Sequence, residues 1–227
     1  MAIGLRGVGA HGTKEGAGNA VPGLPAGWQP GDIHFLLAAT SRNDEVPLPA
    51  GYTSLVAAPD VDGITDLTVR LAWCRAQEGD AAPSIACTAA NSLTAQIAGF
   101  SGAKAAGDPW HKVGETGETP NPIEAASITT TVPGCAILFA ALTDNDFAFS
   151  GWSGEKPAFT ELFDSLFNAA TAKDSTIGLA WGLQEAAGAT GPRTVAQSSG
   201  ATLGVGYLLA LEPAAGAVAD TRRRMPV

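Results

Sequence analysis

Charged side chains are scarce in this sequence. Asp, Glu, Lys and Arg make up 15% of its 227 residues, against roughly 25% in an average soluble protein. Helical bundles cover their surfaces with Lys, Glu and Arg, so this scarcity argues against one. Hydrophobic residues reach 45%, which excludes a disordered chain. The length suits one large all-β domain or two small ones with a substantial core.

Basic charge in particular is lacking. The chain carries 13 basic and 22 acidic residues, for a net charge of −9. Proteins that bind nucleic acid present a basic face to the phosphates, so no nucleic-acid partner is expected. The one basic run is Arg222, Arg223 and Arg224 near the C-terminus. Two interpretations of it stay open: a solvated tail, or a docking peptide for an acidic surface on a neighbouring subunit.

Cysteines are few, and long apolar runs are absent. Cys74, Cys87 and Cys135 form no CxxC pair. Cys74 and Cys87 flank a turn and would face each other across a hairpin, but three buried, reduced thiols are the favoured interpretation. The first residues lack the apolar stretch of a signal peptide. The apolar runs at 33–39 and 135–142 are too short to span a bilayer. We expect a soluble chain made in a cytoplasm, with no membrane insertion.

Recognisable cofactor and metal motifs are also lacking. The segment 7–12 reads GxGxxG, but the glycines and prolines that follow exclude the helix of a dinucleotide site. His11, His34 and His111 have no second ligand at metal-binding spacing. His34 alternates inside an apolar run and is expected to be a satisfied core or edge histidine. The sequence therefore predicts no metal, no cofactor and no catalytic residues.

Three aspartates, Asp60, Asp62 and Asp66, surround Gly63. They resemble a fragment of a calcium loop, although the distant Glu that closes an EF-hand is absent. Hydrogen bonds from Asp side chains within a turn explain the same residues. Both interpretations stay open.

What the sequence does have is strict alternation of apolar and polar or small residues, which predicts strands with one buried face. Strands are predicted at 3–8, 33–39, 53–57, 67–74, 84–88, 94–100, 127–132, 136–142, 177–183 and 203–211. Two of them, 33–39 and 136–142, are continuous apolar runs and are predicted to be buried on both faces. Turn residues rich in Gly, Pro, Asn and Asp separate them. About ten such strands predict an all-β, jelly-roll-like antiparallel β-sandwich. One exception is 157–172, where apolar residues at helical spacing predict a short amphipathic helix.

The sequence also repeats itself loosely. A Pro-Gly pair opens an apolar strand at 30 and again at 133. GYT at 51–53 corresponds to GWS at 151–153, and DLTVRLAW at 66–73 to DSTIGLAW at 174–181. The separation of about 100 to 108 residues suggests a duplicated half-sandwich. We expect one domain over 1–213, including the N-terminal strand and the Gly-rich loop 1–29, followed by a flexible tail over 214–227.

Four aromatic residues fall in or beside turns rather than strands: Trp28, Tyr52, Trp110 and Trp152. Exposed rings on a β-sandwich stack on sugars or anchor a protein interface. The alternative is that each ring plugs one end of the sandwich beneath its loop. The four are candidate contacts for a glycan or a protein partner.

The order of motifs carries a resemblance. PGD at 30–32 is followed by PAGYT at 49–53, an alternating strand ending WCRA at 73–76, QIAGFSG at 96–102 and ITTTVPG at 128–134. This order resembles the β-sandwich minor tail and virion-surface structural proteins of tailed bacteriophages, over residues 3 to 212. Tyr52 stands where Trp is usual in that family, and the Arg-rich tail has no counterpart there.

The resemblance implies a non-enzymatic structural component of a tailed-phage virion. A minor tail or tail-tip protein is favoured, with a capsid-surface decoration or head-fibre protein as the alternative. A carbohydrate-binding module for host surface glycans is the second hypothesis. Expected partners are other virion proteins, further copies of this chain and a host glycan. Strand glycines such as Gly178, Gly182, Gly204 and Gly206 leave bare faces on which a neighbouring layer can pack.

Overall fold

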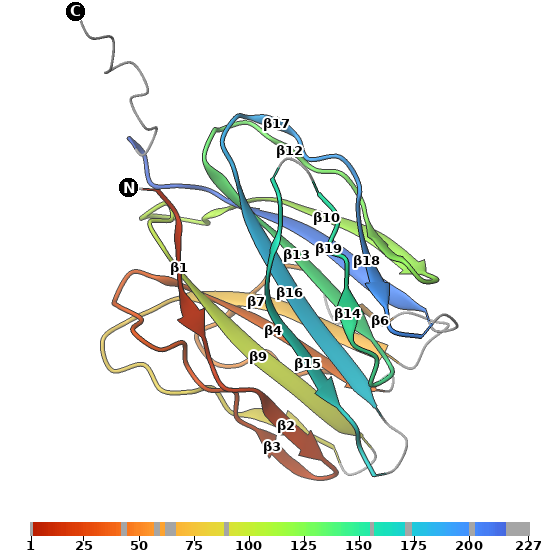
Figure 1. Cartoon of the computed structure of the whole chain (residues 1–227). Coiled ribbons are helices and arrows are strands. Elements are labelled where there is room, and N and C mark those ends of the chain that lie inside the picture. The colour runs from red at the N-terminus through yellow and green to blue at the C-terminus, as the bar shows by residue number, and fades with distance from the viewer. Residues whose placement is uncertain are drawn as a thin grey trace, which may run out of the picture.

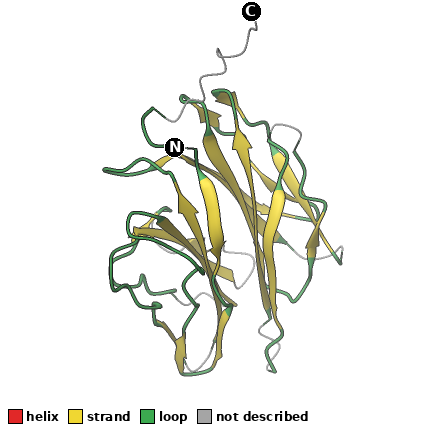
Figure 2. Cartoon of the chain, turned by 60° about the vertical axis from the view of Figure 1, so that its left-hand side comes forward, coloured by secondary structure: helices red, strands yellow, loops and turns green. Residues whose placement is uncertain are grey.

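A computed structural model of the protein describes residues 2–41, 45–56, 60–61, 67–88, 91–154, 157–170, 174–199 and 203–216. Strands are the long regular elements of this part of the chain (Figures 1 and 2). These contain β1 (Gly4–Val8), β2 (Gly12–Glu15), β3 (Gly18–Ala20), β4 (Ile33–Ser41), β5 (Thr53–Ser54), β6 (Asp60–Val61), β7 (Leu67–Arg75), β8 (Ile85–Cys87), β9 (Ser92–Ser101), β10 (Trp110–Thr119), β11 (Ile123–Ala125), β12 (Thr129–Thr130), β13 (Cys135–Thr143), β14 (Phe149–Ser150), β15 (Thr160–Phe167), β16 (Ser175–Gln184), β17 (Gly188–Ala189), β18 (Arg193–Gln197) and β19 (Gly204–Leu211). No helix in this part of the chain has the length and apolar character to cross a membrane.

Two large antiparallel sheets form the sandwich. The first has the order β1-β9-β4-β7-β5, with β2 also paired to β9 and β6 to β7. The second has the order β10-β19-β13-β16-β15. In Figure 1 the first sheet runs from red to yellow-green and the second from green to blue, so each half of the chain builds one sheet. The predicted all-β sandwich is confirmed.

The two sheets repeat one topology. A central strand, β4 or β13, pairs on one side with β7 or β16 and on the other with β9 or β19. The register repeats as well, because Trp73 lies opposite Phe35 in the first sheet and Trp181 opposite Leu138 in the second. The duplicated half-sandwich that the sequence suggested is therefore present in the strand order and in the pairing.

Glycines at matching turns support this repeat. Gly31 and Gly134 precede the central strands with φ values of 93° and 77°. Gly51 and Gly151 precede the two GYT/GWS aromatics with φ values of 82° and 65°. Such left-handed backbone disfavours residues with a Cβ, which explains why glycine stands at both copies of each turn.

The core lies between the two sheets. Inward-facing residues of the central strands alternate with outward-facing ones, as period-two strands require. The first sheet contributes Phe35 on β4 and Val69 on β7 to the buried inter-sheet cluster, and the second contributes Leu138 on β13. The largest fully buried side chains of this cluster include Tyr207 and Phe100. Apolar packing between the two repeated halves therefore holds the sandwich together.

Small sheets cover the outer faces. β3 and β8 pack with Leu36, Ala38 and Ala72 on the outside of the first sheet, and β11, β14 and β18 cover the second. Glycine makes this approach possible, because a Cβ at Gly204 would overlap Ile123 and one at Gly206 would overlap the carbonyl of Glu124. The layer that packs on these bare strand faces therefore belongs to the same chain.

The helix predicted over 157–172 is wrong. Residues Thr160–Phe167 form strand β15, which pairs with β16 along one edge of the second sheet. The register shifts between Glu161 and Phe163, and the consecutive residues Leu162 and Phe163 both contact the inter-sheet core. A shift of this kind breaks strict alternation. For this reason the apolar residues of this edge strand do not alternate, and their spacing resembles that of a helix.

The ten predicted strand regions all contain strand residues, although 53–57 and 127–132 keep only the two-residue strands β5 and β12. The sequence missed nine further strands of the described chain, among them β2 (GTKE), β10 (WHKVGETGET) and β18 (RTVAQ). These segments are polar or Gly-rich and lie at sheet edges or in the small sheets, where one face stays wet. The prediction of one domain over 1–213 stays a prediction, and 217–227 lies outside the described residues.

Candidate functional site

A small cavity of about 150 Å³ opens on the outer side of the first sheet. His34 and Cys74 are cross-strand partners on β4 and β7. Because Ile33 and Phe35 face the inter-sheet core, the alternation of the strand directs His34 to the opposite face. Tyr52, from the turn before β5, and Asp80, from the loop after β7, also line the cavity, together with the polar residues Arg75 and Gln77.

Three metal-ligand side chains converge in this cavity. A ring nitrogen of His34, Sγ of Cys74 and a carboxylate oxygen of Asp80 all lie within 4.8 Å of one another. The backbone N–H of Gln77 donates to Oδ2 of Asp80 at 2.8 Å, and the N–H of Asp80 donates back to the Gln77 carbonyl at 3.2 Å. This tight turn fixes the Asp80 carboxylate beside the other two groups. The set combines imidazole, thiol and carboxylate.

His34 is wholly buried, with an exposed fraction of 0%, and neither of its ring nitrogens has a hydrogen-bond partner among the described residues. Trp28 packs edge-on against the imidazole, with ring centroids 5.5 Å apart. Burial lowers the pKa of His34, opposed by the negative charges of Asp80 and Asp32. The expectation of a satisfied core histidine is therefore wrong, because the aromatic and strand neighbours of the ring give its nitrogens no hydrogen bond.

The thiol of Cys74 does not have the character of a catalytic nucleophile. Burial raises its pKa to about 11, whereas the neighbouring Tyr52 hydroxyl lowers it and the Asp80 charge raises it. Nucleophilic cysteines instead have lowered pKa values, so that the thiolate is populated. Burial, with a smaller effect of the Cys74 thiol, raises the pKa of Tyr52. A thiol with a raised pKa suits metal ligation, in which the ion displaces its proton, better than acyl transfer.

The sequence predicts no metal ligands, because none of the three histidines has a second ligand at short spacing. His34 and Cys74 are 40 residues apart, and only the pairing of β4 with β7 brings them together. The alternation of β4 and β7 did contain a signal, since it placed His34 and Cys74 on the faces opposite Phe35 and Trp73. The register needed to match them was not available from the sequence.

Of the four candidate aromatics, one lines this cavity and another packs against its histidine. Trp28 contacts His34, and Tyr52 lines the cavity and packs on the outer core of the first sheet. Both rings are half-buried. They do not form one flat exposed platform with Trp110 or Trp152, which lie elsewhere.

Trp110 is 8% exposed and packs against Phe35, with ring centroids 5.6 Å apart. Burial leaves almost no face of this indole for a sugar, so Trp110 acts as a plug of the inter-sheet core. Trp152 is half-buried on the outside of the second sheet, where it packs edge-on against Phe139 at 5.1 Å. Its Nε1 donates to Oε2 of Glu161 at 2.8 Å. Tyr52 and Trp152 are thus the matching rings of the two repeats.

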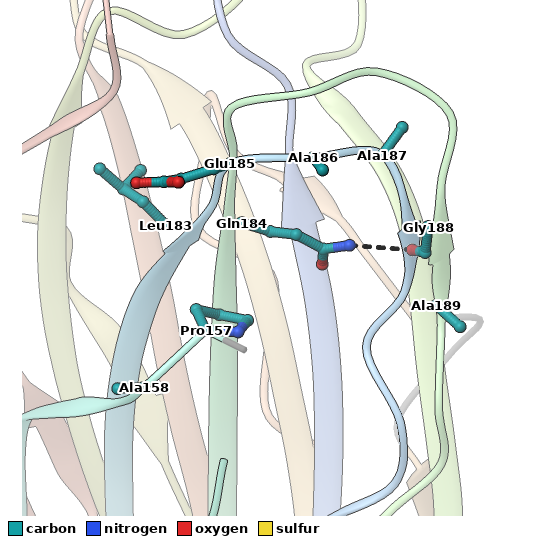
Figure 3. A pocket seen from close by; sticks show the side chains of 9 residues that line it. All are labelled: Pro157, Ala158, Leu183, Gln184, Glu185, Ala186, Ala187, Gly188 and Ala189. Atoms are coloured by element: carbon teal, nitrogen blue, oxygen red, sulfur yellow. Dashed lines mark hydrogen bonds between the residues drawn. The ribbon is translucent and has the colours of Figure 1, made fainter. Parts of the chain in front are cut away.

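A second concavity, of about 560 Å³, lies at one end of the second sheet (Figure 3). It is lined by Pro157, Ala158, Leu183, Gln184, Glu185, Ala186, Ala187, Gly188 and Ala189. We call it the alanine groove. The amide of Gln184 donates to the Gly188 carbonyl at 2.9 Å and closes the β16–β17 turn. Glu185 is the one ionisable side chain among these described lining residues, so the groove has the chemistry of a contact surface.

The remaining candidates from the sequence are the arginine run, the three aspartates and the cysteines. Arg222, Arg223 and Arg224 lie outside the described residues, as do Asp62 and Asp66, and only the backbone of Asp60 is described. The three cysteines are free thiols. Cys87 lies on β8, which pairs with β3 rather than with β7, so the hairpin that would have opposed it to Cys74 does not form.

The GxGxxG segment connects β1 to β2. A Cβ at Gly9 would overlap the Gly23 carbonyl, and one at Gly12 would overlap Pro22. These glycines admit the 21–25 segment of the same chain, which accounts for them without a nucleotide.

Comparison with known proteins found no matching family model, no matching curated protein and no matching solved structure.

Proposed function

We propose that this protein is a non-enzymatic structural component of a tailed-phage particle, most specifically a minor tail or tail-tip protein. The observation that carries the proposal is the position of the family-like motifs in the fold. The PGD and PG turns precede the central strands β4 and β13, and the GYT and GWS turns place Tyr52 and Trp152 on the outer faces of the two sheets. The motif order thus recurs in both halves of the sandwich.

The shape and chemistry of the surface support a contact role. The larger concavity, the alanine groove, is lined mainly by Ala, Pro, Leu and backbone, without an acid–base pair among its described residues. Leu183 in this groove is 40% exposed. Small side chains around a concavity leave room for the backbone of a partner to approach closely. A virion subunit obtains part of its stability from such neighbours.

The test is detection of the chain in intact particles. Purified particles of the phage that encodes it are analysed by mass spectrometry and cross-linking, and an epitope-tagged copy is localised by immunogold electron microscopy. We expect the chain in intact particles, cross-linked to itself and to tail proteins, with gold at the tail. Absence from purified particles overturns the structural role. Gold on the capsid replaces the tail assignment with a capsid-surface one.

A truncated chain lacking Asp220–Val227 tests the predicted docking tail in the same particles. Loss of incorporation with an unchanged thermal unfolding midpoint identifies the Arg-rich segment as the docking peptide. Normal incorporation identifies it as a solvated tail and leaves the contact to the sandwich itself.

A further inference from the structure

We propose that His34, Cys74 and Asp80 bind one divalent transition-metal ion of the zinc class on the outer face of the first sheet. The site links strand β4, strand β7 and the 77–80 turn. This inference is independent of the role of the protein in a particle, because it rests on the geometry of the cavity alone.

The donor set matches this class of metal. Zinc is bound in proteins by imidazole nitrogen, thiolate sulfur and carboxylate oxygen, commonly in tetrahedral geometry. Metal–ligand distances of about 2.0 to 2.3 Å place tetrahedral ligands roughly 3.3 to 3.8 Å from one another. The three donor atoms already lie within 4.8 Å of one another. Rotations of the Cys74 and Asp80 side chains that move each donor atom by about one ångström close the set around an ion.

His34 supplies an independent sign of a ligand. A buried imidazole normally has a hydrogen-bond partner on at least one nitrogen. His34 is completely buried, both of its nitrogens lack a partner among the described residues, and it lies among the residues that line the cavity. An ion in the cavity gives this ring a partner.

The second sheet provides an internal comparison. Its register aligns Trp181 with Trp73 and Leu138 with Phe35, so the pair that corresponds to His34 and Cys74 is Ile137 and Gly182. Ile137 belongs to the buried apolar cluster, and Pro157 and Ala158 pack over Gly182. In the second sheet the corresponding position is therefore filled by Ile137 and by the residues that pack over Gly182. The polar set on the other sheet is not required by the architecture.

A fourth position faces the cavity. The Tyr52 hydroxyl is buried in it without an oxygen or nitrogen partner among the described residues, and the volume of about 150 Å³ also accommodates water. Either oxygen completes a four-coordinate ion. On binding, the Cys74 thiol loses its proton to solvent and ligates as the thiolate. The net charge of the ligand set with a divalent ion is then zero, which suits a partly buried site.

The test uses the full chain, purified without a histidine tag and treated with chelator. Cobalt(II) is the spectroscopic probe, since a tetrahedral site gives intense visible d–d bands and a thiolate ligand adds a near-ultraviolet charge-transfer band. We expect one equivalent of Co²⁺ to produce both signals and Zn²⁺ to displace it. We also expect Zn²⁺ to raise the thermal unfolding midpoint.

Three variants decide the assignment. Cys74→Ser removes the charge-transfer band. Asp80→Asn weakens Zn²⁺ binding at least about tenfold. Its amide oxygen can still accept the hydrogen bond from the Gln77 N–H, so the partly exposed turn is kept. Cys135→Ala removes a thiol from the second sheet and leaves the spectrum and the Zn²⁺-induced shift of the unfolding midpoint unchanged. Absence of the cobalt bands in the folded wild-type chain overturns the proposal, as does an unchanged spectrum and midpoint shift in both Cys74→Ser and Asp80→Asn.

Discussion

The hydroxyl of Ser165 on β15 donates a hydrogen bond to the side-chain carbonyl of Gln96 on β9, and so joins the two sheets of the sandwich. Gln96 is only 7% exposed, and its amide also donates to the Gly9 carbonyl at 2.9 Å. Both functional groups of this buried side chain are therefore satisfied by segments distant in the sequence. The bond is a polar link across an interface where apolar packing dominates.

Ser165→Ala is expected to destabilise the fold by about 1 to 3 kcal/mol, because the carbonyl of Gln96 loses its partner in a buried setting. Urea unfolding followed by tryptophan fluorescence measures the change. Ser84→Ala, at an exposed loop position, is the matched control and should stay within about 0.5 kcal/mol of the wild type. Equal stability of the two variants would show that this link contributes nothing.

Gly206→Ala is expected to destabilise the chain by about 1 to 3 kcal/mol, since its methyl group would overlap the Glu124 carbonyl and force the small outer sheet away from β19. Thermal unfolding is the measurement. Gly4→Ala is the control, because the nearest atom to its new methyl group, Oγ of Ser101, lies at an ordinary contact distance of 3.4 Å. A Gly206 variant as stable as the Gly4 variant contradicts close packing of the outer layer.

Asp164 makes stability depend on pH. Burial raises its pKa to about 6 from 3.8, a nearby charge on Glu161 adds to the rise, and a hydrogen bond from the Phe149 N–H opposes it. The folded state therefore binds more protons than the unfolded state between these two values. The contribution of Asp164 to stability falls as pH rises through this window.

Asp164→Asn removes this titration. The stability of the variant relative to wild type should be greater at about pH 7 than at about pH 4, because only the wild type loses stability as Asp164 ionises. Urea unfolding at the two pH values measures the difference, and Glu78→Gln at an exposed position is the control. A difference between Asp164→Asn and wild type that does not change with pH would rule out the shifted carboxyl.

The thiols should react slowly in the native protein. Burial raises the pKa of both Cys74 and Cys135 to about 11, and Cys87 is buried on β8, so little thiolate is available at neutral pH. An aromatic disulfide reagent should titrate three thiols in denaturant without reductant and far fewer in the same time under native conditions. Only one reactive thiol in denaturant would instead reveal a disulfide.

The alanine groove should be sensitive to charge if it contacts a neighbour in the particle. Leu183→Glu, inside the groove, is expected to reduce incorporation at least about tenfold by placing an unpaired charge in an apolar contact. Leu166→Glu is the matched control, because Leu166 has a similar exposure, 43% against 40%, on β15 of the same sheet but outside the groove. Incorporation is measured by complementing a gene deletion with each variant and quantifying the chain in purified particles by mass spectrometry. Equal incorporation of both would exclude the groove as the contact.

The sequence by itself determined the three central strands of each large sheet, β4, β7 and β9 in one and β13, β16 and β19 in the other, and their division into repeated halves. Alternation of apolar residues is a local property, and both β7 and β16 show it along most of their length. The turn glycines were equally readable, since left-handed backbone at Gly31 and Gly134 is a requirement of the turn itself. These signals need no knowledge of distant partners.

Only the tertiary structure decided the rest. β15 became a strand because the open edge of β16 offered its hydrogen bonds, which outweighed a spacing typical of a helix. The metal-ligand cluster depended on the register that sets His34 opposite Cys74 and on the loop that returns Asp80 to them. Register is a relation between strands far apart in the chain, and the hydrophobic pattern fixes which face a residue occupies but not which neighbour it meets.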